Sequence, residues 1–146
     1  FTTLRHYLPI FDAALTATVA RLKERGLLES TLVVVMGEMG RTPRVGKDAG
    51  RQHFGRAWSV LFAGAGVKGG QAVGSSTPDG EHVKDLPVKP EDLMATICQA
   101  AGVDPGTEFH PRTGQKVDPN GPTAGMSVGN TRLVVGSAKP VAEVLA

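Results

Sequence analysis

The sequence predicts an α/β fold, a three-layer sandwich with a mainly parallel sheet, and three observations lead to this prediction. Residues 3–25 carry apolar side chains every three or four positions, which is the pattern of an amphipathic helix. Residues 31–36 (TLVVVM) and 57–63 (AWSVLFA) are short apolar runs without a polar break. Such runs are typical of strands that helices cover on both faces, as in a parallel sheet. A helix that leads through a short turn into such a strand is half of a βαβ unit.

Local signals give the boundaries of the predicted elements. Pro9 indicates that the first helix is kinked or begins near residue 9, and Gly26 ends it. A second helix is predicted at 90–101, because Pro90 suits a first turn, two acids follow it, and Gly102 closes the pattern. Two further short strands are predicted at residues 71–75 and 133–135. Residues 104–130 are rich in Pro and Gly and show no periodicity.

Bulk composition indicates one globular domain. The chain has 146 residues, of which 40% are apolar and 21% charged. A net charge of +2 gives no indication of a polyanion partner, and no nucleic acid is expected. Cys98 lies in an apolar helical pattern and is expected to be a small core residue. The sequence shows neither a signal peptide nor an apolar run long enough to span a membrane.

The strongest local feature is a carboxylate between two glycines, Glu38 in Gly37-Glu38-Met39-Gly40, directly after a predicted strand. Ligands of open α/β sheets bind at the carboxyl ends of strands. Glycine also lets a backbone approach a ligand closely. Glu38 is therefore a candidate for contact with a ligand or metal, and the alternative is a solvated loop acid or a helix cap.

A histidine closes the same long polar loop. His53 follows Glu38 by fifteen residues and stands just before the next predicted strand. If the two strands are neighbours, we expect both side chains at one edge of the sheet. Imidazole nitrogen and carboxylate oxygen together suit Zn, Mn or Fe, although stable sites have three or four ligands. The alternative is a loop histidine that bonds a backbone carbonyl.

Four stretches of the chain resemble one protein family in their order and spacing. They are RLKERGLLESTLVVVMGEMGRTPR, KDAGRQH, AWSVLFAGAGVKGGQAVGSS and PVKPEDLMATICQAAGVDP. The chain is identified by them, over residues 1–104, as similar to the bacterial DUF1501 family. That family resembles the alkaline phosphatases, sulfatases and cofactor-independent phosphoglycerate mutases. The resemblance implies an alkaline-phosphatase-like domain, of which residues 1–146 would be a single partial, carboxy-terminal portion.

The resemblance also implies a site. Glu38 takes the place of a metal-binding aspartate, and His53 that of a later histidine ligand. Met39 stands where the phosphatases have a histidine for a second metal, and a thioether is a poor ligand for Zn, Mn or Ca. A one-metal or altered site is therefore expected. The family's nucleophile would lie upstream of Phe1, so the active site is expected to be incomplete within this chain.

These expectations converge on a metal-dependent hydrolase of a sulfate or phosphate ester, borne by a small molecule or a glycan. Glu38 and His53 would bind a divalent ion (Zn, Mn, Fe or Ca), which would act as a Lewis acid and template. Arg51 would stabilise charge on the ester, and Arg41 has a weaker claim to this role. The alternative for these arginines is that they pair with Glu38 or Asp48, or are solvated. The alternative is a non-catalytic, sulfatase-like protein that binds or assembles through the same crevice. Through the resemblance alone, export to the periplasm is expected.

Overall fold

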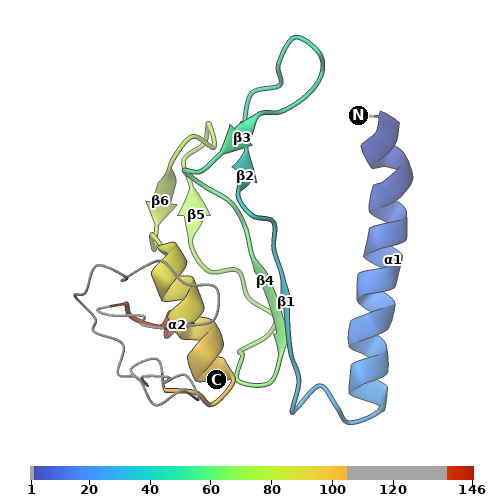
Figure 1. The fold of residues 1–146 in the computed structure, drawn as a ribbon, viewed down its shortest axis with the longest axis vertical. Coiled ribbons are helices and arrows are strands. Elements are labelled where there is room, and N and C mark those ends of the chain that lie inside the picture. Colours follow the sequence, from blue (N-terminus) through green and yellow to red (C-terminus); the bar gives the residue numbers. More distant parts are fainter. Residues whose placement is uncertain (1, 105–137) are drawn as a thin grey trace, which may run out of the picture.

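The computed structural model describes residues 2–104 and 138–146 (Figure 1). The chain begins with the long helix α1, continues through a ribbon of antiparallel strand pairs, and then forms the shorter helix α2. The elements are α1 Thr2–Glu24, β1 Leu32–Val35, β2 Gly40–Arg41, β3 His53–Phe54, β4 Leu61–Gly64, β5 Ser75–Ser76, β6 Val83–Asp85 and α2 Pro90–Ala100.

The central feature is a long hairpin built from two nested antiparallel pairs. The outer pair joins β1 to β4, with Leu32 opposite Gly64 and Val35 opposite Leu61. The inner pair joins β2 to β3. We call residues 40–56, which comprise the inner pair, its loop and the two residues after it, the finger. The finger projects at one end of the molecule, away from α2 (Figure 1).

The prediction of a mainly parallel, three-layer, alkaline-phosphatase-like sandwich is wrong. Each of the three described strand pairs is antiparallel, and each forms its own two-stranded sheet. The physical reason lies between the two apolar runs. Parallel neighbours need a crossover connection, usually a helix, whereas antiparallel neighbours can be joined by a hairpin. Residues 37–56 form no helix, so the chain returns along the strand that it has just left.

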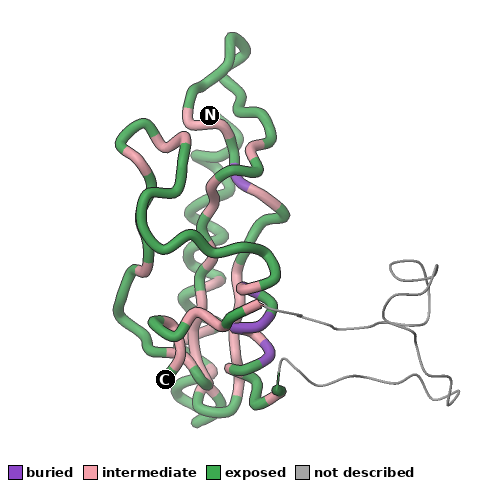
Figure 2. The backbone as a smooth tube through the Cα atoms, turned by 90° about the vertical axis from the view of Figure 1, so that its left-hand side faces the viewer, coloured by how far each residue is buried: buried purple, intermediate pink, exposed green. Residues whose placement is uncertain are grey.

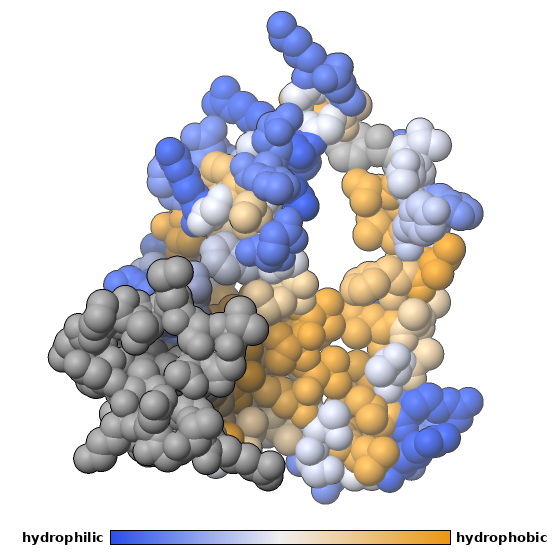
Figure 3. All heavy atoms as spheres, in the orientation of Figure 1, coloured by the Kyte–Doolittle hydropathy of each residue, from blue (hydrophilic) through white to orange (hydrophobic). Residues whose placement is uncertain are grey.

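Helix α1 agrees with its prediction in extent but not in packing. It runs from Thr2 through Pro9 to Glu24, so of the two alternatives that Pro9 suggested, a kink or a start near residue 9, the late start is wrong. None of its residues is buried, and Leu4, Leu8 and Phe11 are each about half exposed, at 48%, 54% and 52%. It runs beside the β1–β4 pair, with apolar side chains on the facing surfaces (Figures 1 and 3). Within the described residues, no helix combines the length and the apolarity that crossing a bilayer requires.

The core lies around α2, whose prediction is confirmed. Pro90 begins the helix, and the Asp92 carboxylate accepts a hydrogen bond of 3.1 Å from the Lys89 backbone N–H, which satisfies one donor at the helix start. Most of the buried positions in Figure 2 belong to this helix. They are Leu93, Ala95, Thr96 and Cys98. Cys98 is thus the small core residue that its apolar surroundings predicted.

The last nine residues, 138–146, form a strap across α2 that the sequence did not predict. Its backbone N–H groups donate to two α2 side chains: Lys139 to Asp92 Oδ1 at 3.0 Å, and Val141 to Thr96 Oγ1 at 2.9 Å. Further along the strap, Gln71 Nε2 donates to the carbonyl of Glu143 at 2.6 Å. The strap therefore joins α2 to the segment that follows β4. The strand predicted at 133–135, and nearly all of the loop-rich segment 104–130, lie outside the described residues.

Candidate functional site

The base of the finger brings together an acid, an arginine and a histidine. In the β2–β3 pair, Arg41 stands directly opposite His53, so their side chains share one face of the ribbon. Arg41 Nη2 donates to Glu38 Oε1 at 3.0 Å. Glu38, fifteen residues before His53 in the sequence, is thus bonded to the residue that stands opposite His53 in the ribbon.

The electrostatics of the site keep Glu38 ionised. A hydrogen bond within its own residue lowers the pKa of the Glu38 carboxyl most, followed by the charge of Arg41, and His53 acts in the same direction. Arg41 and Glu38 are well exposed, with 46% and 60% of their side chains accessible. Exposed ion pairs of this kind are weak, so a stronger partner can displace Arg41 from the carboxylate.

Gly40 fixes the geometry of this cluster. It is buried, and a Cβ at this position would lie 2.0 Å from the carbonyl oxygen of Ala57. The backbone of β2 therefore lies directly against the chain that leads into β4. The sequence suggested that glycine here serves close approach to a ligand, but the structure gives Gly40 a packing role instead.

Arg51 lies on the same arm of the finger as His53 and holds the loop together. Its Nη1 donates to the carbonyls of Thr42 at 2.8 Å and Pro43 at 2.9 Å. Thr42 extends the ladder by one step, since its N–H donates to the carbonyl of Gln52 at 3.0 Å. Arg51, which the sequence favoured for charge stabilisation, thus uses one guanidinium nitrogen to bond the backbone. Its guanidinium has two further nitrogens with which to bind an anion.

Two residues of this site, Glu38 and His53, have side chains of the kind that binds metal ions. Among residues 2–104 and 138–146, no group of three His, Cys, Asp or Glu side chains could hold a metal ion. Carboxylate oxygen and imidazole nitrogen are suitable donors for Zn, Mn or Fe. Glu38 and His53 have suitable donor types, and a metal site that contained both would need at least one further ligand.

Two other histidines and the tryptophan belong to other parts of the fold. His82 is in the turn between β5 and β6, where the Thr77 carbonyl accepts the Gly80 N–H at 2.8 Å. Trp58 is half-buried, and its Nε1 has no hydrogen-bond partner within the described residues. His6 stacks edge-on against Tyr7 in α1. Neither His82 nor His6 forms a group of three possible metal ligands with Glu38 and His53 in the described part of the chain.

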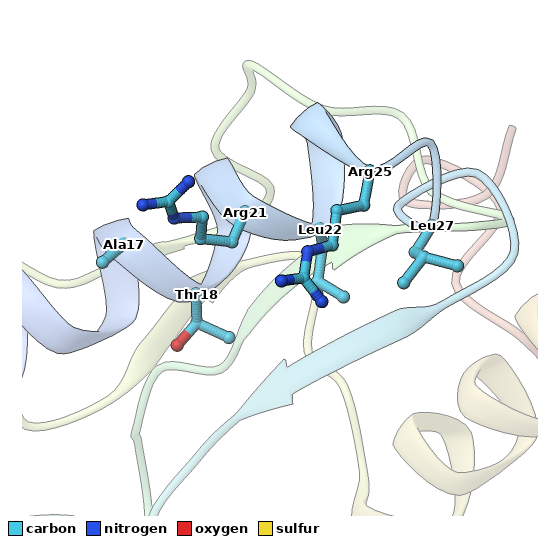
Figure 4. A pocket seen from close by; sticks show the side chains of 6 residues that line it. All are labelled: Ala17, Thr18, Arg21, Leu22, Arg25 and Leu27. Atoms are coloured by element: carbon cyan, nitrogen blue, oxygen red, sulfur yellow. The ribbon is translucent and has the colours of Figure 1, made fainter.

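A surface hollow of about 410 Å³ lies at the opposite end of the molecule from the finger (Figures 1 and 4). The end of α1 and the turn after it line the hollow, through Ala17, Thr18, Arg21, Leu22, Arg25 and Leu27. Arg21 is paired with Glu24 at 2.9 Å. The hollow contains none of the predicted site residues.

The two arginines differ in what they bond. Arg41 bonds the Glu38 carboxylate, whereas Arg51 bonds backbone carbonyls, and the charge-stabilising role expected for them stays a prediction. A spacing of three residues between opposite charges is a contact signal in helices, and this segment was expected to be a loop. The cross-strand pairing of Arg41 with His53 has no signal in the sequence without the register of the hairpin.

The fold and the site together define a chain with an antiparallel ribbon whose exposed base carries an ionised acid, an arginine and a histidine. The chain belongs to the DUF1501 family. The family model, described as a protein of unknown function (DUF1501), matches residues 1–124 and confirms the family resemblance seen in the sequence. No curated protein and no solved structure matches the chain. The further likeness to phosphatases and sulfatases gains no support from these comparisons.

Proposed function

We propose that this chain contributes two metal ligands, Glu38 and His53, to the active site of a hydrolase of sulfate or phosphate esters. One observation carries the proposal: the β2–β3 register sets His53 opposite Arg41, and Arg41 in turn bonds the Glu38 carboxylate. This arrangement, in which the acid is bonded to the residue opposite the histidine, supports a site that draws on both arms of the hairpin. The ester class comes from the sequence resemblance described above.

The chain's own residues have distinct roles in this proposal. Glu38 is ionised at neutral pH, as a ligand must be, and its own backbone and Arg41 lower its pKa further from the ordinary value. When bound, a divalent ion supplies Lewis acidity at the ester oxygen. Arg41, once it is released from Glu38, can bind the charged group of the ester, for which a guanidinium has a matching fork of donors. Arg51 holds the loop in place and can add its remaining donors.

Metal analysis of the full-length protein tests the proposal. Wild type, Glu38→Ala and His53→Ala are dialysed exhaustively, and their metal content is measured by elemental mass spectrometry. His82→Ala is the matched control, because His82 is also an exposed histidine but lies in a different turn. We expect near-stoichiometric Zn, Mn, Fe or Ca in wild type and in His82→Ala, with loss in the other two variants. Wild-type protein without bound metal would refute the proposal.

Activity assays then separate the ester classes. Aryl sulfate and aryl phosphate are offered to the metal-containing protein, and release of the phenol is followed by absorbance. We expect one of the two esters to be cleaved, and His53→Ala to lose that activity together with its metal.

The second candidate function is a non-catalytic binding or assembly protein. Two observations favour it: the described residues provide two metal-type donors rather than three, and Met39 adds a poor ligand beside Glu38. In that case the cluster binds the charged group of a ligand without cleaving it. Ligand binding by protein that contains no metal, with neither ester cleaved, is the result that selects this candidate.

A further inference from the structure

Positive charge is concentrated on the finger. Residues 40–56 hold five of the chain's 16 basic residues and one of its 14 acidic residues. The finger therefore carries a net charge of +4, and the rest of the chain carries −2. The net charge of +2, which gave no indication of a polyanion partner, conceals this separation. All five basic residues are exposed: Arg41, Arg44, Lys47, Arg51 and Arg56.

The finger presents these charges from an ordered backbone. Arg51 ties its own arm to Thr42 and Pro43 on the other arm. At the tip, the Gly46 N–H donates to the carbonyl of Gly50 at 2.8 Å, and this contact closes the turn. A binding surface that is already ordered loses less conformational entropy when a ligand arrives.

Most of this charge is accessible to a ligand. Arg44 Nε approaches Glu81 Oε1 at 3.5 Å, but 88% of the Arg44 side chain remains exposed, so this pair is weak. Lys47 and Arg56 are exposed at the tip and at the base of the finger, respectively. The end of the molecule where the finger lies is strongly hydrophilic (Figures 1 and 3).

We propose that the finger is a docking surface for a polyanionic polysaccharide that carries sulfate or phosphate groups. The sulfate or phosphate groups are taken from the proposed function, on which this proposal rests. The finger narrows the substrate class from any such ester to a polymer with repeated charges. The basic residues are spread from the base of the finger, at Arg41 and Arg56, to Lys47 in the turn at its tip, so a polymer with repeated charges can contact more of them than a single small ester can. A charged chain lying along it would pass Glu38 and His53 at the base.

The composition of the finger favours a polysaccharide over a single-stranded nucleic acid. Proteins that bind single-stranded nucleic acid combine basic grooves with aromatic side chains on which the bases stack. Residues 41–52 contain no aromatic residue, and Phe54 is half-buried. Guanidinium groups, by contrast, bind sulfate and phosphate groups through paired hydrogen bonds and need no stacking platform.

Binding of dextran sulfate, with unsulfated dextran as its matched control, tests the proposal by calorimetry on the full-length protein at several salt concentrations. The finger variant combines Arg44→Gln, Lys47→Gln and Arg56→Gln. The control variant combines Arg21→Gln, Lys23→Gln and Arg25→Gln, and removes three charges near the end of α1. We expect the finger variant to lose roughly tenfold or more in affinity and to show a flatter salt dependence, because fewer counterions are exchanged. The control variant should change affinity by less than about twofold.

Three results would overturn the proposal: equal losses in the two variants, dextran binding as tight as dextran sulfate, or tighter binding of single-stranded DNA of equal charge. The metal measurement on Glu38 and His53 variants is independent of these results. Metal without dextran sulfate binding leaves a hydrolase of small esters. Dextran sulfate binding without metal leaves the finger as the surface of a binding protein.

Discussion

Replacing Thr96 by Val tests how the strap is attached to the core. Thr96 is 1% exposed, and its hydroxyl makes two contacts. It donates to the Asp92 carbonyl at 2.6 Å and accepts the Val141 N–H at 2.9 Å. Valine has nearly the same shape and a similar helix propensity, so the substitution removes the hydroxyl with little change in packing.

The expected cost follows from the group that is left without a partner. The Asp92 carbonyl is an acceptor within the helix, so loss of the Thr96 hydroxyl leaves it with a backbone donor. The Val141 N–H is part-buried and loses its acceptor. An unsatisfied donor of this kind costs about 1–3 kcal/mol. For a chain of this length, that corresponds to a fall in Tm of about 3–9 °C.

Thermal denaturation followed by circular dichroism measures this cost, and amide hydrogen exchange at Val141 localises it. The matched control is Thr18→Val in α1. The Thr18 hydroxyl also donates to a carbonyl four residues earlier, at 2.8 Å, but Thr18 is exposed. We expect the control to change stability by less than about 0.5 kcal/mol.

Equal Tm values for Thr96→Val and Thr18→Val would show that the strap contributes nothing through Thr96. Unchanged exchange at Val141 would show that its N–H has another acceptor. Either result would refute the reasoning, because both consequences follow from the same hydrogen bond.

Two further predictions concern Asp92 and Gly40. Hydrogen bonds from the Lys139 N–H and then the Lys89 N–H lower the pKa of the Asp92 carboxyl from its ordinary 3.8, so its stabilisation is present above that pH and is lost as pH falls through the lower folded-state value. The Tm of wild type should therefore exceed that of Asp92→Asn by the largest amount at pH 7, and this difference should shrink below pH 3.8. A difference that does not change with pH would contradict the stabilising role of the Asp92 carboxylate. Gly40→Ala should cost about 1–3 kcal/mol, because the new Cβ meets a carbonyl oxygen at 2.0 Å. Gly55→Ala, where a Cβ has no atom within 4 Å, is its control in the same melting experiment, and equal effects would exclude the clash.

Local patterns predicted the helices well. The apolar spacing of residues 3–25 and the Pro90 start signal both correspond to helices of nearly the expected length. The apolar run at 31–36 became β1, whereas the run at 57–63 formed a strand only toward its end, from Leu61. An apolar run indicates burial on both faces of a strand, but β1 is half-buried throughout. The apolar run at 31–36 therefore predicted a strand, but it did not predict that the neighbouring strand is antiparallel.

The nearness of Glu38 and His53 was predicted from an incorrect premise. In a parallel pair, a residue after one strand and a residue before the next lie at opposite edges of the sheet. In an antiparallel pair the end of β1 lies beside the start of β4, and this brings Glu38 and His53 to the same end of the ribbon.

The sequence by itself determined the helices, the apolar runs, the family, and the choice of Glu38 and His53 as candidate ligands, because these depend on local spacing and side-chain chemistry. The direction of the strands, the position of Arg41 opposite His53, and the attachment of the strap through Asp92 and Thr96 follow only from the tertiary structure. These contacts depend on hairpin register and on chain segments up to 47 residues apart. No local pattern encodes such distances, since they are fixed when the backbone hydrogen bonds and the buried side chains are satisfied together.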